Sequence, residues 1–184
     1  MENRSTFYKM KVVTNIEVPQ QWQITNDWDS HRPLLYLASK NTQQSITEFG
    51  CGYGSTKLLQ SLCYDRENNK ESNRIFVCHE TNKEWADIIR PQAYWEHSYL
   101  SINPTYITRL IFIDSAPAEE RKYLIAKHSW SAYVIVVHDT ELSADYVYGM
   151  KEILNTFKYR LDFRPEGLPH TSAVSNFINI QDWI

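Results

Sequence analysis

This chain has few glycines and cysteines, and it has no excess of basic residues. It has 5 glycines in 184 residues, and its 3 cysteines form no C-x-x-C pair, which argues against a disulfide framework or a zinc site. Lysine and arginine (19) do not outnumber the acidic residues (22), so no basic stripe for nucleic acid is present. No apolar run could span a bilayer, and the N-terminus lacks a signal-peptide core. We therefore expect a cytoplasmic protein with neither a membrane nor a nucleic-acid partner.

Alternating strand and helix patterns predict one α/β domain over residues 1–184, with a mostly parallel sheet. Apolar runs such as 110–113 predict strands that are buried on both faces, while the segments between them have helical periodicity. Expected strands are 45–49, 74–78, 94–97, 110–113 and 133–137, and expected helices are 55–64, 83–90, 118–128 and 144–155.

The hydrophobic period changes near the C-terminus. Phe157, Tyr159, Leu161 and Phe163 alternate with charged residues, which predicts a half-exposed strand. A turn rich in proline and glycine follows, and 171–178 returns as the last strand. The domain is therefore expected to close with an antiparallel β-hairpin.

Three of the five glycines gather in one stretch, Glu48-Phe49-Gly50-Cys51-Gly52-Tyr53-Gly54-Ser55, between an expected strand and an expected helix. Glycine lets the backbone turn tightly and approach a ligand closely, because no Cβ blocks it. The dinucleotide fingerprint G-x-G-x-x-G/A would require Gly or Ala where Ser55 stands. A plain strand-to-helix turn is the alternative to a nucleotide-binding loop.

The pattern E-x-G-x-G-x-G-S resembles motif I of class I S-adenosylmethionine-dependent methyltransferases. This resemblance implies a Rossmann-like, seven-stranded, mostly parallel sheet with helices on both faces, whose last strand is antiparallel. It also implies that Glu48 and the loop from Gly50 through Cys51, Gly52 and Gly54 to Ser55 hold the methionine part of the cofactor. Residues 1–30 would be an N-terminal arm or lid, and 31–184 the α/β core.

Glu80, followed by Thr81, stands at the end of the second expected strand. A carboxylate there can accept hydrogen bonds from both ribose hydroxyls. Glu80 and Thr81 are therefore candidate cofactor contacts. The alternative role for Glu80 is that of an acidic residue at the start of the next helix, stabilised by the helix dipole.

Asp114, His138 and Asp139 follow the two buried strands in the middle of the chain. Ligands of open α/β sheets bind at the carboxyl ends of the strands, so these three are the candidate catalytic residues. His138 could act as general base for a hydroxyl acceptor. The alternatives are structural: His138 satisfying a core hydrogen bond and Asp114 capping the next helix.

Asp114 and Asp139 also raise the question of whether the protein binds a divalent metal ion. Catechol-type O-methyltransferases hold a divalent ion with an aspartate after strand four and an Asp-Asn pair after strand five. Here the second element reads His138-Asp139-Thr140, and no third ligand is apparent. We expect no metal, with Asp114 and Asp139 as the residues that would hold one.

The sequence thus favours an S-adenosylmethionine-dependent methyltransferase acting on a small molecule, at oxygen. Asp114-Ser115-Ala116-Pro117 lacks the second proline and the aromatic residue of many N-methyltransferases of DNA or protein. An NAD-dependent oxidoreductase and a non-catalytic binding protein of the same fold are the alternatives. The acceptor and the oligomeric state stay open.

Overall fold

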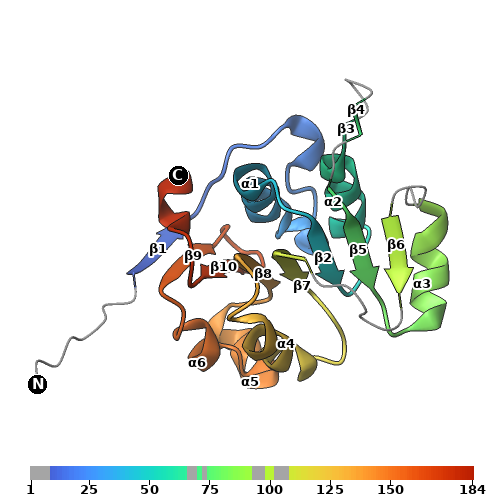
Figure 1. Cartoon of the computed structure of the whole chain (residues 1–184). Coiled ribbons are helices and arrows are strands. Elements are labelled where there is room, and N and C mark those ends of the chain that lie inside the picture. The colour runs from blue at the N-terminus through green and yellow to red at the C-terminus, as the bar shows by residue number, and fades with distance from the viewer. Residues whose placement is uncertain (1–8, 66–69, 72–73, 93–97, 102–107) are drawn as a thin grey trace, which may run out of the picture.

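In the computed structural model, the described residues are 9–65, 70–71, 74–92, 98–101 and 108–184, and they form an α/β sandwich (Figure 1). The strands of the main sheet are β1 (Lys9–Val13), β2 (Ile46–Phe49), β5 (Phe76–His79), β6 (Ser98–Ser101), β7 (Leu110–Ile113), β8 (Val134–His138), β9 (Tyr159–Phe163) and β10 (Thr171–Ser175). The helices are α1 (Arg32–Thr42), α2 (Ser55–Cys63), α3 (Lys83–Ile89), α4 (Glu120–His128), α5 (Leu142–Tyr148) and α6 (Lys151–Leu154). Two further short strands, β3 (Tyr64–Asp65) and β4 (Lys70–Glu71), pair only with each other.

The strand order of the main sheet is β1-β9-β10-β8-β7-β2-β5-β6. The five strands from β8 to β6 are parallel, and β10 is antiparallel to both of its neighbours. This arrangement confirms the predicted Rossmann-like sheet and its C-terminal hairpin. An eighth strand extends it: β1, from the N-terminal arm, pairs in parallel with β9 at the sheet edge.

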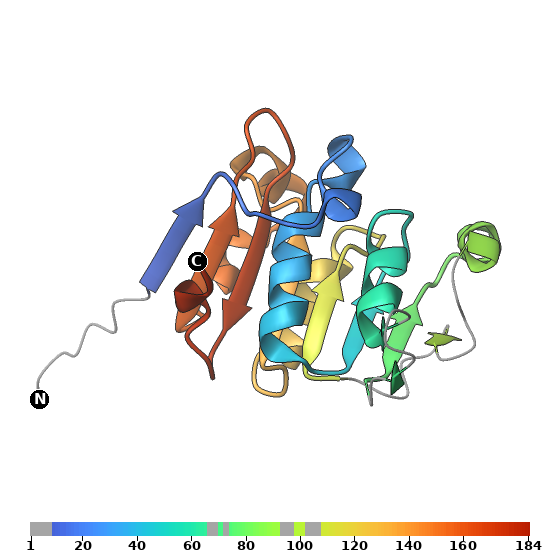
Figure 2. The ribbon, with the colours of Figure 1, turned by 90° about the horizontal axis from the view of Figure 1, so that it is seen from above.

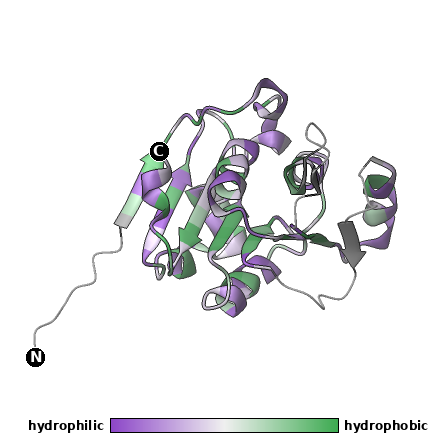
Figure 3. Cartoon of the chain, turned by 45° about the horizontal axis from the view of Figure 1, so that its top comes forward, coloured by the Kyte–Doolittle hydropathy of each residue, from purple (hydrophilic) through white to green (hydrophobic). Residues whose placement is uncertain are grey.

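Helices cover both faces of the sheet (Figure 2). Helices α1 and α2 pack over one core, which contains Leu34 and Leu58 together with alternate strand residues such as Phe112. Helices α4 and α6 pack over the other core, around Ile125 and Leu154. The central strands are correspondingly the most hydrophobic part of the molecule (Figure 3). Every residue of β7 and β8 is buried, as the apolar runs predict.

The prediction of a half-exposed strand in the C-terminal hairpin is wrong. Four of the five residues of β9 are buried, including the charged Arg160 and Asp162. Arg160 Nε lies 2.6 Å from Asp162 Oδ1, and Arg164 Nη2 lies 2.7 Å from Asp162 Oδ2. Ser172 of β10 also donates to Asp162. The polar face of β9 is buried because its charges neutralise each other inside the sheet layer, and alternation alone cannot reveal this.

The helix predicted over 144–155 is two helices. Helix α5 ends at Tyr148 and is followed by Gly149, which adopts a left-handed conformation with φ +59°; α6 begins at Lys151. A left-handed glycine is the usual C-terminal residue of a helix, so the break follows from Gly149 itself. The strand expected at 94–97 lies outside the described residues. Among the residues that the structure describes, no helix is long and apolar enough to cross a membrane.

Candidate active site

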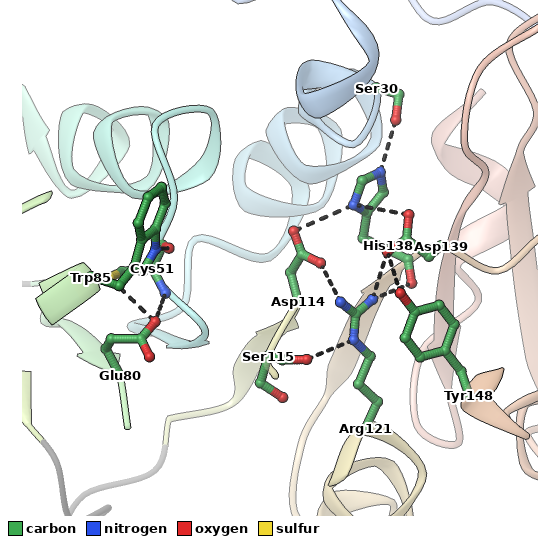
Figure 4. Close-up of polar contacts among 10 residues, drawn as sticks. All are labelled: Ser30, Cys51, Glu80, Trp85, Asp114, Ser115, Arg121, His138, Asp139 and Tyr148. Atoms are coloured by element: carbon green, nitrogen blue, oxygen red, sulfur yellow. Dashed lines mark hydrogen bonds and ion pairs between the residues drawn. The ribbon is translucent and has the colours of Figure 1, made fainter. Parts of the chain in front are cut away.

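The candidate site lies at one edge of the sheet, where four parallel strands end side by side. Phe49 at the end of β2 is in register with His79 of β5 and Ile113 of β7, and Ile113 is in register with Val137 of β8. Each strand therefore delivers its next polar residue to the same edge. Two groups of residues result: the glycine loop with Glu48 and Glu80, and a cluster around Asp114 and His138. Figure 4 shows Glu80 beside Cys51 of the glycine loop, and the cluster around Asp114 and His138.

Gly50 is required by the fold of the loop. Its φ is +88°, and a Cβ at this position would lie 2.4 Å from the carbonyl oxygen of Asp114. Gly54 is also confined, because a Cβ there would lie 2.8 Å from Asp29 Oδ1 and 3.1 Å from the His31 ring. At Gly52 a Cβ would meet only Ser55 Oγ, at 3.4 Å. Of the three glycines in this motif, Gly52 is thus the one at which the surrounding protein would tolerate a side chain.

Glu48 is fully buried beneath the glycine loop. Its Oε2 accepts a hydrogen bond of 2.7 Å from Thr56 Oγ1, whereas its Oε1 has no hydrogen-bond partner. Burial raises the pKa of Glu48 to about 7, although hydrogen bonds from Ser55 and Thr56 oppose this rise. Ser55, predicted as a cofactor contact, is buried at the start of α2, and its hydrogen bond to Glu48 lowers the pKa of that carboxyl group. Glu48 is therefore a carboxyl group with neutral partners and one free oxygen.

Glu80 joins the two loops that flank the predicted cofactor site. Its Oε2 accepts from the backbone N–H of Cys51 at 3.2 Å, and its Oε1 accepts from the N–H of Asn82 at 2.7 Å. The indole N–H of Trp85 donates to the carbonyl oxygen of Cys51 at 2.6 Å (Figure 4). Thr81, the other residue predicted here, is exposed. The carboxylate thus fixes the glycine loop while remaining at the end of β5.

Arg121, from α4, lies between the two predicted aspartates. Its Nη2 is 2.8 Å from Asp114 Oδ1, and its Nη1 is 3.0 Å from Asp139 Oδ2. Its Nε donates to the carbonyl oxygen of Ser115, and its guanidinium lies 4.4 Å above the ring of Tyr148. One buried cation therefore holds together the loops that follow β7 and β8. Asp139 has φ +55°, a conformation that aspartate tolerates better than most residues.

His138 lies among three polar partners. Its Nε2 is 2.8 Å from Ser30 Oγ, and its Nδ1 is 3.3 Å from Asp114 Oδ2 and 3.5 Å from Asp139 Oδ1. Burial disfavours the charged ring, but the hydrogen bond and charge of Asp114 outweigh burial and raise the pKa of His138. Burial likewise opposes the charge of Asp114, yet His138 and Arg121 bring the pKa of Asp114 below its usual value.

His31 connects the cluster to the glycine loop. It precedes α1, is 2% exposed, and neither of its ring nitrogens has a hydrogen-bond partner. Its ring lies 4.9 Å from that of His138 and 5.0 Å from that of Phe112. Burial, with a further contribution from His138, lowers the pKa of His31 to about 3, so the ring is neutral.

The structure thus brings Asp114, His138 and Asp139 together, and sets Glu48 and Glu80 on either side of the glycine loop.

Sequence reasoning missed Arg121 and Ser30. Arg121 has a faint signal, since it follows Asp114 by seven residues at the start of a helix. Ser30 has none, because it lies 108 residues from His138 in the chain.

Several solved structures share this architecture, and some of them are named as methyltransferases. Cofactor-bound Rv0187 from MTB matches with a TM-score of 0.62 and 15% identity, over 88% of this chain and 85% of its own. A human methyltransferase 10 domain containing protein matches with a TM-score of 0.52 and 11% identity, over 90% and 89%. The METTL16 MTase domain matches with a TM-score of 0.51 and 8% identity, over 89% and 74%.

The chain therefore has the fold of the class I S-adenosylmethionine-dependent methyltransferases. At these identities the likeness concerns the fold and does not extend to a substrate. No family model and no curated protein sequence matches the chain.

Proposed function

We propose that this protein is an S-adenosylmethionine-dependent methyltransferase that methylates a small molecule at oxygen. The observation that carries the proposal is Glu48, a fully buried carboxyl group below the glycine loop with one oxygen unpartnered. A cationic ligand would supply the positively charged partner that Glu48 lacks. S-adenosylmethionine carries a sulfonium and an ammonium group, whereas the pyrophosphate of NAD would be repelled by an ionised Glu48.

Glu80 would bind the ribose. Each of its oxygens accepts one backbone N–H in this structure, and a carboxylate oxygen has two lone pairs. Oε1 can thus accept a further hydrogen bond from a ribose hydroxyl, whereas a second hydroxyl at Oε2 would replace the weak hydrogen bond of 3.5 Å from the Cys51 thiol. Thr81 and the backbone of Cys51 and Gly52 would complete this part of the site. Arg32, whose Nε donates to the Gly54 carbonyl oxygen, is the candidate partner for the carboxylate of the methionine moiety.

The cluster at the ends of β7 and β8 would accept the proton of the acceptor. Methyl transfer is an in-line displacement at carbon, so the enzyme has to align the nucleophile and remove its proton. When His138 Nδ1 donates to Asp114, Nε2 becomes the basic nitrogen. Ser30 Oγ already lies 2.8 Å from Nε2, so the acceptor hydroxyl would displace Ser30 or pass its proton to His138 through the Ser30 hydroxyl. Asp139 would position Arg121 and His138, which it contacts, and would not touch the acceptor itself.

The acceptor class is inferred from the charge of the chain. The similarity to Rv0187 and METTL16 concerns the fold, so it does not separate a small molecule from a nucleic acid or a protein. A small molecule is favoured by the net charge of −3, which disfavours a polyanion. Acceptor panels of small alcohols and phenols, RNA, DNA and peptides distinguish the three classes through release of S-adenosylhomocysteine.

Titration calorimetry tests the cofactor assignment. We expect S-adenosylmethionine and S-adenosylhomocysteine to bind and NAD not to bind. Glu80→Ala should weaken S-adenosylhomocysteine by about 1–3 kcal/mol, because charge-assisted hydrogen bonds are lost. Glu84→Ala, an exposed glutamate in the first turn of α3, is the matched control and should bind normally. Binding of NAD alone would refute the proposal, and unchanged affinity in a folded Glu80→Ala variant would remove the ribose assignment.

A second measurement tests catalysis. His138→Ala should bind S-adenosylhomocysteine as the wild type does but lose turnover on an acceptor found in the panel. Normal turnover of this variant would exclude His138 from the reaction. If the wild type binds the cofactor and methylates nothing in any panel, the non-catalytic alternative gains support.

A further inference from the structure

Three potential metal ligands converge beside the glycine loop. His31, Asp114 and His138 each offer one ligand atom, and these atoms all lie within 4.8 Å of one another. They come from three separate elements: the residue before α1, the loop after β7 and the last residue of β8. We propose that His31, Asp114 and His138 form a binding site for a divalent transition-metal ion.

His31 is the observation that points to a ligand. An imidazole that is 2% exposed and has no hydrogen-bond partner on either nitrogen leaves polar atoms unsatisfied, which is costly in a folded protein. The ring is neutral, as a metal-binding histidine must be. A metal ion held by one of its nitrogens would satisfy this group.

The surroundings of the other two ligands already resemble those of a metal centre. Histidine ligands usually donate their second ring N–H to a fixed acceptor, and ligating carboxylates are themselves hydrogen-bonded. Ser30 Oγ lies 2.8 Å from His138 Nε2, which leaves Nδ1 facing Asp114 Oδ2 at 3.3 Å. Arg121 holds the other oxygen of Asp114. Asp139 is a weaker candidate ligand, because Arg121 already occupies its Oδ2.

The donor set and its charge indicate which ion fits. Two imidazoles and one carboxylate suit Zn²⁺, Mn²⁺, Fe²⁺ or Co²⁺ better than Mg²⁺, which prefers oxygen ligands. With neutral imidazoles, Asp114 and Asp139 outweigh Arg121 by one negative charge, which favours binding of a cation. Ligand atoms around one tetrahedral Zn²⁺ are about 3.3 Å apart, so the three side chains would move closer together on binding.

The metal site does not depend on methyl transfer. If both hold, the ion would take over from His138 the task of making the acceptor hydroxyl acidic. His138 would then be a ligand in the metal-bound protein.

The test uses the metal alone, without cofactor or acceptor. Chelator-treated protein is titrated with Zn²⁺, Mn²⁺ or Co²⁺ by calorimetry, bound metal is counted by elemental analysis, and the visible absorption of bound Co²⁺ is recorded. We expect one ion per chain and a metal-dependent rise in Tm. His31→Ala should lose at least about 100-fold in affinity, and Ser30→Ala, which keeps all three ligands, about 10-fold. His170→Ala, a half-buried histidine elsewhere at the strand ends, should bind the metal normally.

Urea unfolding of each variant separates loss of metal from loss of fold, and Ser30→Ala keeps the test decisive if His31→Ala does not fold. The inference is overturned if no ion binds stoichiometrically, or if folded His31→Ala and Ser30→Ala both bind metal as the wild type does. It is also overturned if His31→Ala weakens only S-adenosylhomocysteine, because His31 would then serve the cofactor. Cofactor calorimetry is independent of these results, so the methyltransferase proposal and the metal site can fail separately.

Discussion

The two halves of the candidate site treat buried carboxyl groups in opposite ways. Beside the glycine loop, Glu48 has hydrogen bonds only from neutral groups, and burial raises its pKa to about 7. At the ends of β7 and β8, Asp114 is paired with Arg121 and His138, and its pKa is lowered despite burial. No positive charge pairs with Glu48, whereas Asp114 is paired with Arg121.

This difference suggests how the halves divide the work. A buried carboxyl group without a cationic partner favours a cationic ligand, which fits the proposed methyl donor. A carboxylate that is already ionised and fixed by an arginine can orient a histidine or bind a metal without first losing a proton. The same residue type thus serves two tasks because its partners differ.

Removal of Arg121 should disrupt the cluster at the ends of β7 and β8, and we expect the largest loss of stability from this change. Arg121→Met leaves Asp114 and Asp139 without their shared cation, which should lower the free energy of unfolding by about 3–5 kcal/mol in urea titrations. Arg109→Met, at an exposed arginine that lies over Tyr133, is the control and should cost under about 1 kcal/mol. A similar loss in both variants would contradict the importance of the buried pairs.

Glu48→Gln should change how the free energy of unfolding depends on pH, which tests the difference between Glu48 and Asp114. The pKa of Glu48 is higher in the folded protein, at about 7, than its ordinary value of 4.5, so the folded state binds the proton more tightly. The free energy of unfolding should therefore fall as pH rises from 4.5 to about 7 and stay level above it, with a Glu48 contribution of about 3 kcal/mol. Urea unfolding between pH 5 and 8 should show this decline in the wild type and a flatter profile in Glu48→Gln. Parallel profiles would show that Glu48 titrates normally.

The glycines separate folding from binding within the first half. Gly50→Ala should cost about 2–3 kcal/mol, because its φ is positive and its Cβ would collide with the backbone of Asp114. Gly52→Ala should change stability by under about 1 kcal/mol, since its Cβ would meet only Ser55 Oγ, at an ordinary contact distance of 3.4 Å. It should nevertheless weaken S-adenosylhomocysteine, because the methyl group would lie where the cofactor is expected. Thermal unfolding and calorimetry measure both quantities. Normal cofactor affinity in Gly52→Ala would remove this glycine from the binding site.

Trp85→Phe should give the smallest effect. It removes the hydrogen bond from the indole N–H to the Cys51 carbonyl oxygen and keeps most of the ring packing, so we expect a loss of about 1 kcal/mol. Trp130→Phe is the control at a tryptophan that is 80% exposed and should leave stability unchanged. Equal stability of the two variants would mean that this hydrogen bond does not restrain the glycine loop.

Local patterns were enough to predict most of the fold. The apolar runs at 110–113 and near 133–137 form central strands because a strand buried on both faces must be hydrophobic throughout. The clustered glycines form a strand-to-helix loop because Gly50 needs a positive φ. Buried β9 and the break at Gly149 were missed, since mutual neutralisation of charges and the end of a helix within a continuous periodic pattern depend on packing.

The amino-acid sequence by itself determined the order of strands and helices, the glycine loop, and the polar residues that follow each strand. Only the tertiary structure decided which of them meet. Ser30 and His31 reach His138 because the start of α1 packs against the ends of β7 and β8, and Arg121 reaches both aspartates because α4 crosses beneath them. Such contacts join residues far apart in the chain, and no local periodicity records them.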